Sequence, residues 1–143
     1  PGFERSYIVQ IAPMLGVRES RRIVGEYVLT SADFFAARKF DDAIARNNYP
    51  IDIHSRDENG GLHHMKVGDY HDIPFRCLIP LAVDNLLVAG RALSADFAAQ
   101  GAVRIIPNCY AMGEAAGVAA AFAVKKAMPV RQVKFEHGVP QAK

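Results

Sequence analysis

Hydrophobic and polar positions alternate in ways that divide the chain into short elements. Two stretches near the start, residues 7–12 and 23–29, are rich in β-branched and aromatic side chains and flank a turn at Gly16. This pattern predicts a β-hairpin. Behind a helix-capping sequence at residues 30–33, apolar residues recur at helical spacing, which predicts a helix that ends near Asn47.

The middle of the chain is typical of short extended segments. Residues 49–54 (YPIDIH) alternate with period two, which predicts a strand. Residues 56–66 have little apolar content and predict an exposed loop or hairpin tip. Residues 70–80 are apolar but contain two prolines, which favours an extended crossing segment over a central strand. The run NLLVA at 85–89, closed by Gly90, is the best candidate for a buried strand.

The last third of the chain turns sharply to alanine and glycine. Eight of the eleven residues from 111 to 121 are Ala or Gly, so residues 107–127 predict a long helix with a small-residue face. Pro107 suits its first turn, and the lysines at 125 and 126 complement the helix dipole. The tail after Pro129 predicts a surface strand or linker. Together the elements indicate a mixed fold class, α+β or α/β.

Composition narrows the class of protein. The 143 residues are 50% hydrophobic and 22% charged, with a net charge of +2, which is typical of one soluble domain without a nucleic-acid-binding or membrane-binding role. The longest apolar run, residues 115–124, is too short to span a bilayer. Cys77 and Cys109 are expected to be free thiols, and one bridge between them is the alternative. The start at Pro1, without a signal peptide, indicates a processed product or a piece of a longer chain, and favours a cytoplasmic location.

The first candidate site lies where the predicted strand ends at Gly90 and the chain reaches the predicted helix at Pro107. A helix N-terminus offers free N–H groups and the positive end of the dipole, which suit a flavin O2 or a phosphate. The first turn carries no acidic residue, since the earliest is Glu114, although many structural helices share this feature. Gly113 and Gly117 predict close packing rather than ligand contact.

Other motifs are missing. The sequence contains neither GxGxxG nor GxxxxGK[ST], so it has no pyrophosphate-binding fingerprint of its own. Four histidines at 54, 63, 64 and 71 lack metal-ligand spacing, which favours exposed loop histidines and no metal site. No GxSxG elbow marks a nucleophile. Cys109 is either a redox-active thiol with a lowered pKa or, as we favour, a small residue near a ligand.

Three arginines, Arg18, Arg21 and Arg22, form a basic cluster that could bind a carboxylate or phosphate in bidentate fashion. In an extended strand the first and last of them share a face while the middle one points away, which disfavours a clamp of all three. The alternative is a network of ion pairs with Glu19, Glu26 and nearby aspartates.

His54 ends the predicted strand over residues 49–54 and lies two positions from Asp52. Imidazole titrates near neutral pH, so His54 is the best acid/base candidate in the chain. A hydrogen-bonded structural role at the strand end is the alternative.

Four segments, in order and spacing, carry a family resemblance: GVRESRRIVGEYVLTSADF, FDDAIARNNYPIDIH, YHDIPFRCLIPLAVDNLLVAGRALSAD and VRIIPNCYAMGEAAGVAAA. They span residues 16–126 and resemble the C-terminal part of bacterial FAD-dependent oxidoreductases. The resemblance implies a glutathione-reductase-type fold, in which an N-terminal GxGxxG half holds the ADP moiety and a C-terminal strand and helix close over the flavin. This chain would be the closing half, without FAD and inactive by itself.

The resemblance also implies site residues and a division of the chain. The cofactor side would comprise Gly90, Arg91, Arg104, Asn108, Cys109 and Tyr110. The substrate side would hold the catalytic candidates His54, Arg18 and Arg21. Within a single domain or fragment over 1–143, residues 1–80 would be substrate-side, 81–128 would belong to the FAD-binding domain, and 129–143 would form a tail.

The expected partners are a small-molecule substrate and the N-terminal dinucleotide-binding half of the same polypeptide. Exposure of the small-residue helix face and of the strand edge at 85–89 also predicts self-association into a homo-oligomer. One motif departs from the family: where relatives commonly read SATHEA, residues 94–99 read SADFAA. This departure keeps open a non-catalytic binding or interaction domain. Some relatives are named xanthan lyase, so a polysaccharide lyase is a further alternative, with no independent support in the sequence.

Overall fold

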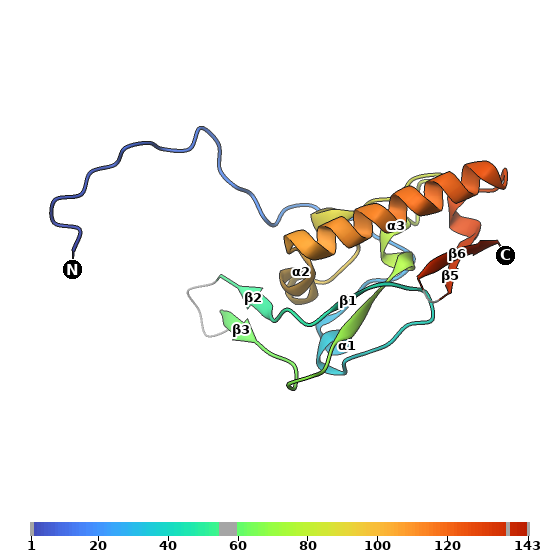
Figure 1. The fold of residues 1–143 in the computed structure, drawn as a ribbon, viewed down its shortest axis with the longest axis horizontal. Coiled ribbons are helices and arrows are strands. Elements are labelled where there is room, and N and C mark those ends of the chain that lie inside the picture. The colour runs from blue at the N-terminus through green and yellow to red at the C-terminus, as the bar shows by residue number, and fades with distance from the viewer. Residues whose placement is uncertain (1, 55–59, 137, 143) are drawn as a thin grey trace.

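The computed structural model describes residues 2–54, 60–136 and 138–142. Within these ranges the mixed helix and strand content expected from the sequence is confirmed (Figure 1). The α-helices are α1 (Ser31–Phe35), α2 (Phe97–Val103) and α3 (Ile106–Lys125). The strands are β1 (Ala43–Asn47), β2 (Ile51–Ile53), β3 (Gly61–His63), β4 (His71–Pro74), β5 (Val133–Glu136) and β6 (Val139–Ala142).

The long C-terminal helix, α3, confirms the prediction for residues 107–127. Proline stands in its first turn and Lys125 in its last, as the sequence indicated. Its buried residues, Met112, Ala115, Ala119 and Ala123, follow one stripe and pack toward β1 and the β5–β6 hairpin. Figure 1 shows α3 running along one side of the fold. In the part of the chain that the structure describes, no helix is long and apolar enough to cross a membrane.

The hydrophobic core draws on segments from most of the chain. Its largest fully buried side chains are Phe34, Phe75, Leu29, Ile51, Ile73, Leu78, Leu93, Met112, His71, Gln100, Val103 and Pro74. The rings of Phe75 and Phe135 pack with centroids 4.7 Å apart, which attaches β5 to the 3₁₀ helix Phe75–Leu78. The tail was expected as a surface strand or linker. The strand is confirmed, but Val133 and Phe135 are buried, so β5 is part of the core.

The predicted helix from residue 30 to Asn47 is wrong after its first turn. The capping sequence is confirmed, because Thr30 and Asp33 form a reciprocal capping box at the start of α1. The helix ends at Phe35, since Ala37 adopts a left-handed backbone with φ of 48°. Residues 43–47 then pair with β4 as strand β1, so tertiary pairing overrides the local helical spacing.

The predicted N-terminal hairpin is also wrong. Residues 7–12 form no strand, are exposed, and belong to an arm that projects from the rest of the chain (Figure 1). Residues 23–29 make two isolated bridges, Gly25 to Pro80 and Leu29 to Ala95. Gly25 lies so close to Ser94 that an added Cβ would stand 2.8 Å from its Cβ. Residues 23–29 therefore contact the segments around Pro80 and Ala95 and do not pair with residues 7–12.

The extended middle segments are largely confirmed. Strand β2 falls inside the predicted strand at 49–54 and pairs antiparallel with β3. The hairpin expected over residues 56–66 is confirmed at its second strand, while residues 55–59 lie outside the described residues. Of the extended segment at 70–80, β4 is a strand and the continuation Phe75–Leu78 is a 3₁₀ helix.

The buried strand predicted at residues 85–89 is wrong. Asn85 has a left-handed backbone with φ of 52°, and Leu86 is 42% exposed. One backbone hydrogen bond, from Val88 to Leu78, joins this run to another segment. No other strand lies beside it in the described ranges to complete a ladder. Helix α2 follows shortly after and was not predicted from the sequence.

Candidate functional site

The candidate site forms where the 3₁₀ helix Gly90–Ala92 meets the first turn of α3. Gly90 has a φ of 84°, a conformation that L side chains rarely adopt. A Cβ added there would lie 3.9 Å from the Sγ atom of Cys109. The two predicted cofactor-side residues Gly90 and Cys109 are therefore brought together by a left-handed glycine.

The N-terminus of α3 has no side-chain cap. Ile105 occupies the cap position without a side-chain hydrogen bond, and the first turn holds no acidic residue. Ile106 is 67% exposed and Tyr110 is 75% exposed, so this end of the helix faces outward in the described chain. The positive end of the dipole and the uncapped N–H groups are thus available to an electron-rich or anionic group.

Arg104 links this site to two other segments. It follows α2 and is buried, and its Nη2 donates to the backbone oxygen of Asp52 over 2.9 Å. Its Nη1 forms an ion pair with Glu19. Burial, and secondarily the positive charge of Arg18, lower the pKa of Arg104 below its ordinary value. The guanidinium therefore holds β2 and the basic segment against the start of α3.

Asn108 is buried in the first turn of α3 and donates from Nδ2 to the Oδ1 of Asn47 over 2.7 Å. The Nδ2 of Asn47 lies 2.9 Å from the Nε2 of His71. Because an amide nitrogen can only donate, His71 accepts there and carries its proton on Nδ1, which lies 3.0 Å from the carbonyl of Asp72. A chain of hydrogen bonds thus runs from α3 through β1 to β4.

Cys109 is half-buried, and its Sγ donates to the carbonyl of Arg104 over 3.5 Å. Burial raises the pKa of Cys109, although the charge of Arg91 opposes the shift. The interpretation of Cys109 as a thiol with a lowered pKa is therefore wrong. The structure places it as a small side chain packed beneath Gly90. The other thiol, Cys77, is fully buried, and burial raises its pKa to about 12.

The arginines predicted for the substrate side, Arg18 and Arg21, lie in the segment before residue 23, which is not a strand. Arg18 and Arg21 both line a hollow of about 160 Å³ together with Arg91. We call this the arginine hollow, and its other lining residues are Val17, Glu19, Ser20 and Ala92. The alternation expected for a strand is therefore wrong here. The ion-pair alternative is also wrong, because no ion pair between described residues includes Arg18, Arg21 or Arg22. Glu19 pairs instead with Arg104 and Glu26 with Arg131.

His54 follows β2 and is exposed, with its Nε2 3.2 Å from a carboxylate oxygen of Asp52. No hydrogen bond or ion pair between described residues joins it to Arg18 or Arg21. The connection is indirect, because the backbone of Asp52 accepts from Arg104, which pairs with Glu19 beside Arg18. His54 is therefore linked to the arginine-bearing segment through Asp52, Arg104 and Glu19.

The expectation about histidines holds in part. His54, His63 and His64 are exposed, but His71 is fully buried, so its assignment as an exposed loop histidine is wrong. Across residues 2–54, 60–136 and 138–142, no three histidine, cysteine or acidic side chains gather in an arrangement that could hold a metal ion.

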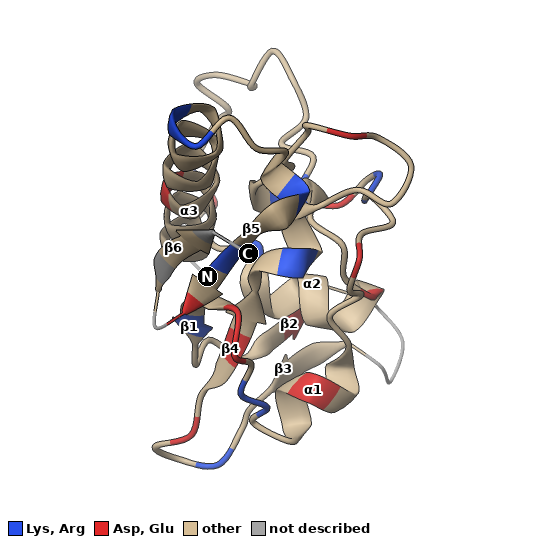
Figure 2. Ribbon diagram, turned by 90° about the vertical axis from the view of Figure 1, so that its right-hand side faces the viewer, with Lys and Arg blue, Asp and Glu red and all other residues tan. Residues whose placement is uncertain are grey.

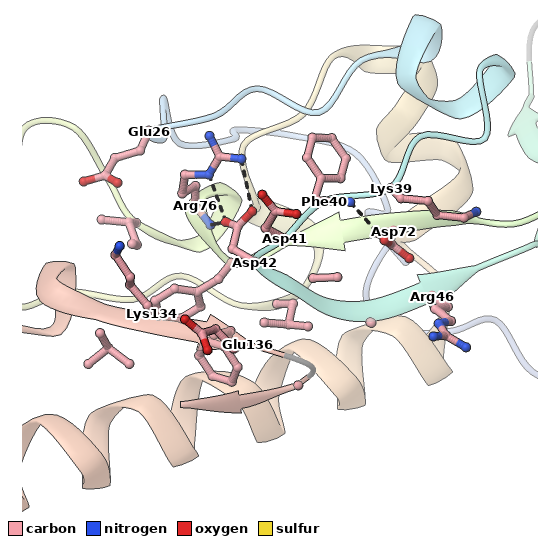
Figure 3. A pocket seen from close by; sticks show the side chains of 18 of the residues that line it. Glu26, Lys39, Phe40, Asp41, Asp42, Arg46, Asp72, Arg76, Lys134 and Glu136 are labelled. Carbon is pink, nitrogen blue, oxygen red and sulfur yellow. Dashed lines mark hydrogen bonds and ion pairs between the residues drawn. The ribbon is translucent and has the colours of Figure 1, made fainter. Parts of the chain in front are cut away.

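A larger cleft, of about 1190 Å³, opens between β1, β4 and β5 and was not predicted from the sequence (Figure 3). Its charges are of both signs, as they are over the whole fold (Figure 2). Arg76 pairs with Asp42 through two hydrogen bonds of 2.9 and 3.0 Å, and Arg131 donates to Glu26 over 2.6 Å. Because acidic and basic side chains are mixed along the lining and two of its arginines are already paired, the cleft favours no ligand of a single charge.

Comparison with known proteins gives one match. The model of the family described as FAD dependent oxidoreductase matches residues 1–139. No curated protein and no solved structure matches the chain.

Proposed function

Because the chain belongs to the family of FAD dependent oxidoreductases, we propose that it is the C-terminal part of such an enzyme and closes the flavin site there. The observation that carries the proposal is the junction of Gly90 with the uncapped first turn of α3. Gly90 is left-handed and stands against Cys109, so backbone and helix N-terminus face the same region. This arrangement suits the electron-rich edge of a flavin ring.

The residues present fit one part of FAD and not the other. The N–H groups of the first turn are donors without acidic competitors in that turn, which suits O2 and N1 of the isoalloxazine. The ADP moiety needs a glycine-rich turn after a strand, and the sequence contains no GxGxxG. The N-terminal dinucleotide-binding half of the same polypeptide would supply that turn, so this chain would be inactive alone.

When bound, FAD would accept a hydride, or two electrons and a proton, from an organic substrate. The first turn of α3 would stabilise negative charge at the O2 and N1 edge. Arg104 would act indirectly, since its guanidinium already binds Asp52 and Glu19. On the substrate side, Arg18 and Arg21 would bind the substrate, and His54, paired with Asp52, would hold or release a proton.

The outward face of α3 supports the presence of an N-terminal half. Gly113 and Gly117 have open space where a Cβ would be, and Val118 and Val124 of the same helix are exposed. Small residues at this spacing permit close approach of another backbone. The unpaired run at residues 85–89 is a strand-like sequence without a sheet. In this proposal the N-terminal half packs on α3 and pairs with this run.

A non-catalytic binding domain remains the second candidate because of the departure at residues 94–99. Asp96 caps α2 by accepting from the backbone of Ala99 over 2.7 Å, and it also accepts from the backbone of Ser31 over 2.7 Å. The neighbouring Phe97 is half exposed. The Asp96 carboxylate is thus occupied by two backbone donors and Phe97 has no acid/base group, so this segment supports the fold. Neither the family match nor the geometry supports a polysaccharide lyase.

The test is the visible absorption spectrum of the longer protein that carries this chain, with the 143-residue chain titrated with FAD beside it. We expect flavin bands in the longer protein and no binding by the chain alone. Gly90→Ala should lower the flavin content, whereas Gly68→Ala should preserve it. The pair is matched, because Gly68 has a similar φ of 89° in an open loop. A longer protein that is colourless even after reconstitution with FAD would favour the binding domain.

A further inference from the structure

The arginine hollow has an excess of positive charge that the chain does not neutralise. Four charged side chains line it: Arg18, Arg21, Arg91 and Glu19. The single carboxylate, Glu19, is in an ion pair with Arg104, which stands behind the hollow. Among the described residues, no carboxylate lies within ion-pair distance of the three lining arginines. The guanidinium groups of Arg18 and Arg21, and the Arg91 donors other than Nη1, are therefore available to an anion from outside the chain.

A buried side chain, that of Gln100, joins the two segments that line the hollow, and we call it the clamp. Gln100 is fully buried, and its Nε2 donates to the carbonyl of Arg18 over 3.3 Å and to that of Arg91 over 3.2 Å. Arg18 and Arg91 belong to the two segments that line the hollow, residues 17–21 and 91–92. A second link crosses the same gap, because Nη1 of Arg91 donates to the carbonyl of Val17 over 2.7 Å. The backbone of Ile23 donates to that of Ala92 and closes the end.

The clamp uses main-chain carbonyls and leaves most guanidinium donors free. Gln100 contacts Arg18 through its backbone, so the side chain of Arg18 takes no part in fixing the wall. Arg18 and Arg21 are both exposed. A scaffold that fixes the backbone while its cations stay unpaired is the arrangement expected of a preorganised anion site.

We propose that the arginine hollow binds a carboxylate of an organic substrate, through the guanidinium groups of Arg18, Arg21 and Arg91. The inference rests on the proposed function and names the substrate class of the same site. The planar guanidinium matches a carboxylate in bidentate geometry. The hollow lies beside Gly90 and the 3₁₀ helix that leads to the flavin region, so a bound carboxylate would direct the rest of the molecule toward the flavin.

A pyrophosphate is the other source of anionic oxygens and is disfavoured by the lining. Dinucleotide pyrophosphates are bound by glycine-rich turns and helix N-termini, through backbone N–H groups. No glycine and no α-helix N-terminus lines the arginine hollow. The volume of about 160 Å³ also suits a small anionic group better than a dinucleotide.

The test is a calorimetric titration of the chain with malonate, a small dicarboxylate. Arg18→Gln and Arg21→Gln should each weaken malonate binding about tenfold or more, since each removes charge-assisted hydrogen bonds. Arg5→Gln is the matched control, because it makes the same charge change in the exposed arm, outside the hollow. Thermal melts of all three variants should match the parent, as the clamp uses backbone carbonyls. ADP should not compete with malonate.

Three results would overturn the inference: no malonate binding, an equal loss in Arg5→Gln, or displacement of malonate by ADP. The last would assign the hollow to a pyrophosphate. Flavin is absent from this titration, so its outcome is independent of the proposed function. Malonate binding in a protein that never binds flavin would remove the flavoenzyme and keep the anion site. Flavin binding without malonate binding would keep the flavoenzyme and remove the anion site.

Discussion

Asn108 in the first turn of α3 and Asn47 at the end of β1 are joined by a hydrogen bond of 2.7 Å, and both side chains are buried. Both the oxygen and the nitrogen of the Asn47 side-chain amide form hydrogen bonds. Its Oδ1 also accepts from the backbone of Tyr49, and its Nδ2 donates to the carbonyl of Tyr49 and to His71. The end of the helix that we assign to the flavin is thereby positioned by one satisfied polar network.

Asn47→Ala should lower the free energy of unfolding by about 1–3 kcal/mol for each buried group that it leaves unpaired. Those groups are Nδ2 of Asn108 and Nε2 of His71. Denaturation in urea measures the loss. The control is Asn48→Ala, because Asn48 is the exposed neighbour and should change stability little. Equal losses in both variants would mean that the network does not stabilise the fold.

Stability should fall in mild acid because of His71. Burial lowers its pKa below the ordinary 6.5, and the charges of Asp72, Lys39 and Asp33 act on it more weakly. Below about pH 6.5 the unfolded chain binds a proton that the folded chain resists, so the free energy of unfolding decreases as pH falls. Above that pH the contribution is constant.

The measurement is urea denaturation at a series of pH values, with His71→Gln as the test variant. We expect the free energy of unfolding of this variant to fall less steeply below about pH 6.5. His63→Gln, at an exposed position on β3, should retain the slope of the parent. A parent chain whose stability is flat across this window would contradict the prediction.

Replacing Gly25 or Gly117 by alanine should have opposite effects on the stability of the chain. In Gly25→Ala the new Cβ would stand 2.8 Å from the Cβ of Ser94 and 3.1 Å from the carbonyl of Arg76. Such crowding should destabilise the chain by about 1–3 kcal/mol. In Gly117→Ala the Cβ meets nothing within 4 Å, and alanine favours the helix by about 0.5–1 kcal/mol. Thermal melts of the two variants compare them directly.

A larger side chain at Gly117 tests whether another part of the longer protein covers the exposed face of α3. Gly117→Leu should be tolerated by the 143-residue chain, because the position is open. In the longer protein it should loosen the contact with the N-terminal half and lower the flavin content. Unchanged flavin content in the longer protein would mean that this face is not covered there.

The two thiols should react slowly and in a fixed order. Burial raises the pKa of both, to about 12 for Cys77, so little thiolate exists near neutral pH. Cys109 is half-buried and Cys77 is fully buried, so an alkylating reagent should label Cys109 first. Mass spectrometry after timed exposure to iodoacetamide gives the order. Rapid labelling of Cys109 at neutral pH would restore the interpretation of a reactive thiol.

The sequence alone determined the features that depend on local or repeated patterns. The small-residue run and its flanking charges predicted α3, the period-two alternation predicted β2, and Thr30 with Asp33 predicted the cap of α1. The missing GxGxxG limited what part of a dinucleotide site this chain could form. The ordered motifs indicated the family that the comparison then matched.

Only the tertiary structure decided the pairings between distant segments. Helical spacing after residue 35 yielded to pairing with β4, and the strand-like run at 85–89 stayed outside any described sheet because it has no neighbouring strand. The arginine hollow joins residues 17–21 to residues 91–92, and Gln100, which clamps it, carries no motif. Hydrogen-bond partners and burial depend on contacts far apart in the chain, which local periodicity does not encode.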